Sequence, residues 1–201
     1  MIFDGVEALD FCGPFEVFSA TAERTQPPPF SVYTVAENRR PVIANNNLSV
    51  NPSYTLSDSP RLDILLVPGG YGTRKQMRNP VVLDWIRRCA SEVELLLSVC
   101  TGALLLGAAG LLDGLSATTH QSAVALLKQV APRSTVVGKE RVVDNGHIIL
   151  SAGITAGIDM SLYVIQRLLG NAQAVETAAY MEYDWRHQKN VHQHTPDRAE
   201  S

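Results

Sequence analysis

The sequence predicts an α/β fold, a three-layer, flavodoxin-like sandwich in which helices cover both faces of a mostly parallel central sheet. Segments typical of strands and of helices alternate along the 201 residues, as they do in proteins with parallel sheets. Residues 62–67 and 93–99 are short apolar runs, which is typical of strands buried on both faces. Apolar residues make up 45% of the chain and charged residues 18%, so a sizeable core can form.

The first half of the chain opens with a very short strand that Phe3 closes. Pro14 predicts the first turn of a helix that runs to about Ala22, and three prolines at 27–29 then interrupt it. A second helix is expected to begin at Asn79, which precedes a proline. Alternating or continuous apolar runs predict strands over residues 30–35, 48–50 and 62–67.

The second half begins with the apolar segment 93–112, in which Glu94 is the only charged residue. This length would span a bilayer. Because small and polar residues interrupt it at 98–102, we expect a buried strand and then an apolar helix, and no membrane partner. Asn145-Gly146 predicts a hairpin between residues 142–143 and 148–150. The remaining strand and helices are expected at residues 117–119, 121–129, 155–169 and 171–184.

Domain organisation and location follow from length, charge and cysteine usage. We predict one domain over residues 1–184 and a polar tail over residues 185–201. The net charge is −3, with 17 Lys+Arg against 20 Asp+Glu, so no broad basic face is expected and no nucleic-acid partner. Three cysteines are too few for a disulfide framework, and the first residues lack the pattern of a secretory signal. These features favour a cytoplasmic protein.

The most informative motif is Cys100, which stands between the predicted strand 93–99 and the helix after it. In parallel sheets, sites form at the carboxyl ends of strands. A sharp strand-to-helix turn, a nucleophile elbow, would lift the sulfur into a cleft, and Gly102 makes such a turn sterically feasible. A helix N-terminus stabilises a thiolate, so we expect an exposed, charged sulfur. The alternative is a buried, inert cysteine.

Two further strand ends carry candidate groups. Gly69-Gly70 can bring backbone N–H groups close to a reacting atom, or can form an ordinary turn. Asp10 is either a local cap or a cleft carboxylate that exchanges a proton with Cys100 or with substrate. Cys12 is close to Asp10 in sequence and is expected to line the same site.

These places together resemble the ThiJ/PfpI superfamily, whose fold is shared with class I glutamine amidotransferases. The resemblance extends to about Tyr183 and is strongest to the isonitrile hydratase-like branch. In that branch an Asp, here Asp10, stands where peptidase-like and glyoxalase-like branches usually carry Glu. The matching segments are 3–10 with 13–14, 67–70, 98–102, 117–120 and 153–159.

The resemblance implies catalytic roles for Asp10, Cys100 and Thr101, a small-molecule substrate, and no cofactor or metal. The reaction it implies is hydration of an isonitrile to an N-substituted formamide, in a homodimer. Gly69, Gly70, Cys12 and His120 are expected to contact the substrate. One departure is clear: superfamily members usually have a full first strand, but only two residues precede Phe3 here. We therefore expect either that the sheet loses part of a strand or that the true start lies upstream.

Several alternatives stay open. A glyoxalase- or amidase-like enzyme is one, and a sensor of a ligand or oxidant, related to the ligand-binding domain of AraC-type regulators, is another. Such regulators append helix-turn-helix units, for which the chain leaves no room before Ser201. Glutamine hydrolysis is disfavoured because no His-x-Glu occurs. A metal site in the tail is also disfavoured, although three histidines, His187, His192 and His194, occur there.

Overall fold

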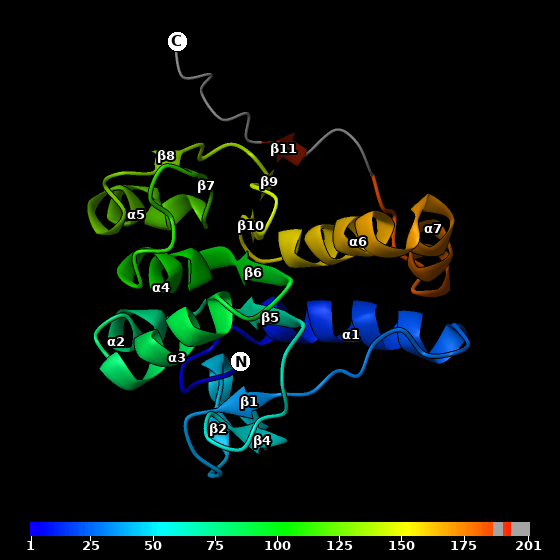
Figure 1. Ribbon diagram of the computed structural model, residues 1–201, viewed down its shortest axis with the longest axis horizontal. Coiled ribbons are helices and arrows are strands. Elements are labelled where there is room, and N and C mark those ends of the chain that lie inside the picture. Colours follow the sequence, from blue (N-terminus) through cyan, green and yellow to red (C-terminus); the bar gives the residue numbers. More distant parts are fainter. Residues whose placement is uncertain (187–190, 194–201) are drawn as a thin grey trace.

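The computed structural model describes residues 1–186 and 191–193, which have the α/β sandwich fold that the sequence predicts (Figure 1). The main sheet has five strands in the order β11-β9-β10-β6-β5. All its neighbouring pairs are parallel except β9 with β10, which form the predicted hairpin. These strands are β5 (Ile64–Val67), β6 (Leu95–Val99), β9 (Val142–Asp144), β10 (Ile148–Ser151) and β11 (Val191–Gln193).

Helices and short strands surround this sheet. The helices are α1 (Ala8–Arg24), α2 (Thr73–Gln76), α3 (Pro80–Ala90), α4 (Ala103–Ala108), α5 (Val124–Val130), α6 (Ala156–Leu169) and α7 (Asn171–Tyr180), with 3₁₀ turns η1 (Asn45–Asn47), η2 (Cys100–Gly102) and η3 (Gln121–Ala123). Three two-stranded sheets pair β1 (Val35–Ala36) with β4 (Tyr54–Thr55), β2 (Val42–Ile43) with β3 (Ser49–Val50), and β7 (Ser116–Ala117) with β8 (Thr135–Val136).

The central strand β6 divides the core into two halves. Alternate side chains of a strand point to opposite faces. Leu95 and Leu97 pack with the helices α1, α6 and α7, whereas Leu96 packs with α3, α4 and α5. Figure 1 shows these two helix layers on either side of β5 and β6. Within the described residues, no helix is long and apolar enough to cross a bilayer.

Helix α1 differs from the prediction at its start. It begins at Ala8, so Pro14 lies inside the helix rather than in its first turn. A proline has no N–H to donate to the carbonyl four residues earlier, here that of Asp10. Next to this missing hydrogen bond, α1 packs closely against α6, since a Cβ on Gly13 would lie 2.9 Å from Ile158.

Other differences concern strand lengths and the chain ends. The strand expected over residues 30–35 is reduced to Val35–Ala36, and the last helix ends at Tyr180 rather than at residue 184. The polar tail contributes β11, which pairs in parallel with β9. The domain boundary at residue 184 stays a prediction.

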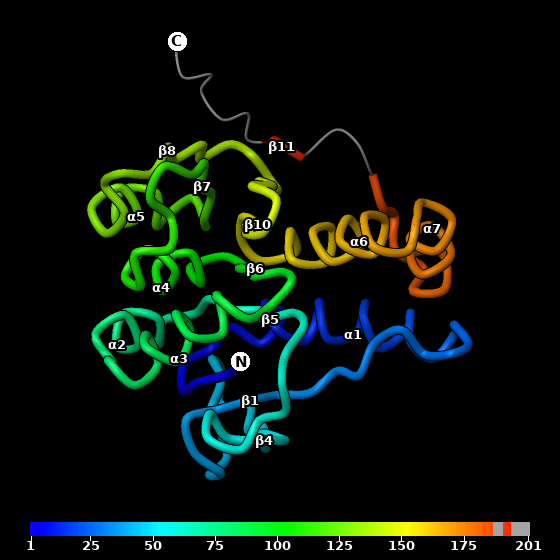
Figure 2. The backbone as a smooth tube through the Cα atoms, viewed as in Figure 1, coloured from blue at the N-terminus to red at the C-terminus, as the bar shows by residue number. Residues whose placement is uncertain are grey.

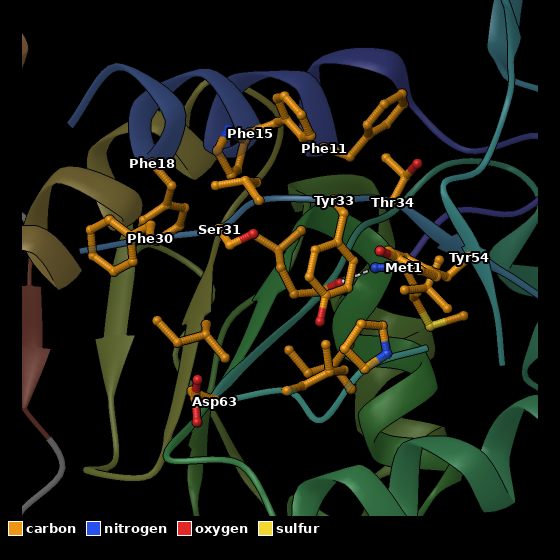
Figure 3. Close-up of a pocket in the computed structure, with 18 of the residues that line it drawn as sticks. Met1, Phe11, Phe15, Phe18, Phe30, Ser31, Tyr33, Thr34, Tyr54 and Asp63 are labelled. Carbon is orange, nitrogen blue, oxygen red and sulfur yellow. Dashed lines mark hydrogen bonds between the residues drawn. The ribbon is translucent and has the colours of Figure 1, made fainter. Parts of the chain in front are cut away.

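The expected first strand does not form a regular strand. Instead, the Met1 amine donates to Leu66 O of β5 at 2.7 Å, and Ile2 N donates to Val35 O of β1 at 2.7 Å. Figure 2 shows the amino end lying between β1 and β5. The two sheets are therefore separate, and an apolar groove lies between them (Figure 3).

Candidate functional site

Cys100 stands on the sharp turn that the sequence predicts. Strand β6 ends at Val99, and Cys100 then has a φ of +57°, a left-handed backbone conformation that is uncommon for a non-glycine residue. Cys100 N donates to Ala152 O at 3.2 Å, which ties the turn to the end of β10. A Cβ on Gly102 would lie only 2.1 Å from Val67 O, so a glycine is required where the elbow crosses β5.

Asp10 approaches this turn from the first turn of α1. Its side chain is fully buried, and Oδ2 accepts a hydrogen bond from Gly69 N at 3.0 Å. The other oxygen, Oδ1, makes no hydrogen bond of good geometry within the described residues. The carboxyl and the Cys100 thiol are close enough to interact and to change each other's pKa. The structure thus brings Asp10 and Cys100 together, as predicted.

Thr101 joins the elbow to the turn at 69–70. Gly70 N donates to Thr101 Oγ1 at 2.9 Å, and Thr73 donates to Gly70 O at 2.7 Å and contacts Thr101 Oγ1 at 3.3 Å. The packing is tight, because a Cβ on Gly69 would lie 2.5 Å from Thr101 N and 2.7 Å from Asp10 Oδ2. The expectation that Gly69 and Gly70 present free N–H groups is therefore wrong, since these N–H groups hold Asp10 and Thr101.

His120 lies next to the sulfur, whereas Cys12 does not. A Cβ on Gly153 would lie 2.3 Å from His120 Cδ2 and 3.1 Å from Cys100 Sγ, so the imidazole and the sulfur flank Gly153. His120 Nδ1 is hydrogen-bonded to Ser122 Oγ at 2.8 Å, which orients the ring. Cys12 is on the exposed side of α1, away from the buried Asp10.

The strand–elbow–helix arrangement agrees with comparison to known families. The family model described as DJ-1/PfpI matches residues 1–167 of the chain. The chain belongs to the DJ-1/PfpI family.

Curated relatives of this DJ-1/PfpI protein include an enzyme and regulators. The chain is 38% identical over 183 residues to the isonitrile hydratase of Pseudomonas putida, an alignment covering 91% of this chain and 76% of that enzyme. It is 29% identical to the HTH-type transcriptional regulator CdhR of Pseudomonas aeruginosa, covering 89% of this chain. The aligned part is 52% of that regulator, so the chain spans about half its length.

Solved structures show the same fold. A THiJ/PfpI family protein from Pseudomonas syringae superposes with a TM-score of 0.82 at 30% identity, covering 91% of this chain and 73% of that one. Drosophila melanogaster DJ-1beta superposes with a TM-score of 0.77 at 22% identity, covering 92% of this chain and 96% of that one. The second likeness shows the fold alone.

The charge state of the pair in this DJ-1/PfpI protein differs from the prediction. Burial and, to a smaller extent, the nearby Asp10 carboxylate together raise the pKa of Cys100 to about 12. The Thr101 N–H acts in the opposite direction but is outweighed. Cys100 is only 6% exposed, so it is a buried neutral thiol and not the exposed thiolate that the sequence predicts.

The Asp10 carboxyl, by contrast, titrates near neutrality. Burial raises its pKa to about 7, although the contacts with Cys100 and with Gly69 N oppose this rise. A group with such a pKa takes up and releases protons readily at neutral pH. The site therefore combines a nucleophilic atom that holds a proton with a carboxyl that can carry this proton away.

Two other aspects of the site concern metals and overlooked residues. Among the described residues, no three His, Cys, Asp or Glu side chains gather as metal ligands. His192 lies in β11, while His187 and His194 fall outside the described residues. Thr73 is a buried member of the site's hydrogen-bond network that the sequence analysis missed, because a threonine in a short helix carries no distinctive pattern.

Proposed function

We propose that this protein is a cofactor-free, cytoplasmic isonitrile hydratase that converts small isonitriles to N-substituted formamides. The observation that carries the proposal is the buried pair of Asp10, with a pKa of about 7, and the Cys100 thiol on its elbow. The 38% identity to an isonitrile hydratase supports the substrate class. An uncharged isonitrile must gain both a proton and a nucleophile at its carbon. The buried Asp10 carboxyl and the neutral Cys100 thiol together supply both.

In the first step, the Cys100 thiol and the Asp10 carboxyl hold one proton between them. That proton passes from the thiol, by way of the Asp10 carboxyl, to the terminal isonitrile carbon, and a C–H bond forms. Cys100 Sγ bonds to the same carbon, which gives a neutral thioimidate, R–N=CH–S–Cys100. The raised pKa of Asp10 matters here, because a carboxyl with an ordinary pKa would be a weak proton carrier at neutral pH.

In the second step, water hydrolyses the thioimidate. The water oxygen bonds to the carbon and one hydrogen goes to the nitrogen. The C–S bond then breaks, the formamide R–NH–CHO leaves, and the hydroxyl proton returns through Asp10 to Cys100 Sγ. Thr101 orients the substrate or the water, while its hydroxyl holds the elbow against the Gly70 turn.

The test is incubation of the purified protein with a panel of isonitriles, methylglyoxal and short peptides, read by product mass. We expect formamides only, and no turnover in Cys100→Ser or Asp10→Asn. Cys12→Ser is the matched control, because this exposed cysteine is outside the pair. Full activity in Cys100→Ser would reject the mechanism, and lactate or cleaved peptide would instead indicate a glyoxalase- or amidase-like enzyme.

A second candidate function is favoured by the regulators among the relatives. The chain aligns with 89% of its length to CdhR. A sensor of a ligand or oxidant would bind small molecules without turnover. The same panel separates the two functions, because a sensor would show saturable ligand binding, or oxidation of Cys100, with no product.

A further inference from the structure

Glu7 is an acidic residue beside the candidate site that the two reaction steps above do not use. It is the N-cap residue of α1, and Asp10 stands three positions later, in the first turn. Side chains at these two positions of a helix start lie close to each other. The side chain of an N-cap residue usually accepts a hydrogen bond from the first N–H groups of its helix, but Glu7 makes no such bond.

The Glu7 side chain is bonded to Asn45 instead. Asn45 Nδ2 donates to Glu7 Oε2 at 2.9 Å, and Asn45 N donates to Val6 O at 2.8 Å, so the amide is anchored to the chain next to Glu7. Asn45 carries no charge, and Glu7 forms no ion pair with a basic side chain in the part of the chain that the structure describes. The negative charge of Glu7 is therefore held in place without being neutralised.

The backbone joins Glu7 to Asp10 through a single residue, Gly69. Glu7 N donates to Gly69 O at 2.9 Å, and Gly69 N donates to Asp10 Oδ2 at 3.0 Å. Asp10 N in turn donates to Glu7 O at 3.2 Å. These hydrogen bonds fix the position of Asp10 relative to Glu7, so a change of charge at Glu7 acts on Asp10 at constant geometry.

The groups around Asp10 define what this charge does. Burial is the main cause of the raised pKa of Asp10; contacts with the Cys100 thiol and with a backbone N–H lower the pKa, and the charge of Glu7 raises it. On α6, which packs against α1, Asp159 is already paired with Arg141. Among the described residues, Glu7 is thus a charge that acts on Asp10 without a neutralising partner.

We propose that Glu7 is a positioning residue that strengthens Asp10 as the base toward the Cys100 thiol, and that Asn45 holds Glu7 in place for this role. For the reaction itself, the inference rests on the proposed function. In that reaction Asp10 must accept the thiol proton before the isonitrile carbon does. A stronger base accepts this proton more readily. Glu7 therefore acts through Asp10 and not on the substrate.

NMR of the aspartate side-chain carboxyl carbons tests the charge effect without any substrate. The Asp10 signal is assigned by its loss in Asp10→Asn, and its midpoint is followed with pH. Glu7→Gln removes the charge but keeps an acceptor for Asn45, so we expect the Asp10 midpoint to fall by about half a pH unit or more. Glu16→Gln is the matched control, because Glu16 is an exposed residue of the same helix. It should leave the midpoint unchanged.

Asn45→Ala tests the second half of the proposal. This change frees the Glu7 side chain, so the Asp10 midpoint should fall in the same direction by a smaller amount. An unmoved midpoint in Asn45→Ala would remove Asn45 from the proposal. Equal midpoints in Glu7→Gln and the natural chain would overturn the role of Glu7, as would a shift of the same size in Glu16→Gln.

Isonitrile turnover as a function of pH is the kinetic arm. The acidic limb of kcat/KM reports the proton on Asp10, so in Glu7→Gln this limb should move to lower pH by the NMR shift, and the plateau should fall about twofold or more. A lower rate with an unmoved limb would indicate a merely structural role and overturn the proposal. A shifted NMR midpoint in a protein that turns over no isonitrile would reject the proposed function but retain the effect of Glu7 on Asp10. Turnover with an unmoved midpoint would do the reverse.

Discussion

Asp10 links the chemistry of the site to the stability of the fold. Its carboxyl is fully buried, and its pKa is raised from 3.8 to about 7 mainly by burial. A folded state that holds a proton more tightly than the unfolded state is stabilised at low pH. The contribution of this proton is complete below pH 3.8 and is lost as the pH rises to about 7.

Replacing Asp10 by Asn should therefore change how stability depends on pH. Relative to the natural chain, we expect Asp10→Asn to gain up to about 4 kcal/mol in the free energy of unfolding between pH 4 and pH 8. Urea unfolding at a series of pH values measures this difference. Asp84→Asn, at an exposed position, is the control. Parallel curves for Asp10→Asn and the natural chain would show that the carboxyl has an ordinary pKa.

The Cys100 thiol offers a second test at the residue scale. With its pKa raised to about 12, the thiol should react slowly with iodoacetamide at pH 8. Asp10→Asn removes a charge that raises this pKa, so alkylation should quicken about tenfold for each unit by which the pKa falls. Peptide mass mapping in a Cys12→Ser background reads the rate at Cys100. Fast alkylation of the natural chain at pH 8 would instead favour the thiolate expected from the sequence.

Gly153 shows how a residue without a side chain shapes the site. A methyl group there would lie 2.3 Å from His120 Cδ2 and 3.1 Å from Cys100 Sγ. We expect Gly153→Ala to displace the imidazole and to lower kcat/KM for the isonitrile about a hundredfold, while the melting temperature changes little. Enzyme kinetics and thermal unfolding of the same sample measure both effects. Unchanged kinetics would mean that His120 has no part in substrate binding.

At the scale of elements, the contact between the elbow and β5 is the most constrained. A Cβ on Gly102 would meet Val67 O at 2.1 Å, and a backbone carbonyl within a sheet cannot move aside easily. We expect Gly102→Ala to cost about 3 kcal/mol of unfolding free energy. Gly138→Ala is the control, because the atoms nearest to its methyl would belong to the Val124 side chain and not to the backbone. Similar urea midpoints for both variants would show that the elbow tolerates displacement.

At the scale of the whole molecule, the sequence predicts what depends on local patterns. The buried strands β5 and β6, the helix opening at Asn79 and the Asn-Gly hairpin all have signals within a few residues, and these predictions are confirmed. Pro14 lies inside α1 rather than in its first turn, and no signal within a few residues marks the start of this helix at Ala8. Likewise, the pKa of Cys100 depends on burial and on Asp10, ninety positions away in the chain.

Exposed apolar side chains bear on the homodimer that the resemblance implies. Leu9 on α1, Ile43 and Leu48 are each more than a third exposed. Gly5, which precedes α1, donates its N–H to Ile43 O, and Ala44 N donates to Leu48 O. Apolar side chains that gather on a surface favour association, and this surface adjoins the helix turn that holds Asp10. We therefore expect a second copy to cover the surface formed by Leu9, Ile43 and Leu48.

A charge on this surface should then separate the copies. We expect light scattering to give a particle of twice the chain mass, and Leu9→Glu to shift it toward the single chain with a loss of activity, because burying an unpaired carboxylate is costly. Val81→Glu, also at an exposed apolar position but on α3, should leave mass and activity unchanged. A Leu9→Glu protein that keeps the mass of the natural particle would place the contact elsewhere. A natural chain that already scatters as a single copy would show that the expected homodimer does not form.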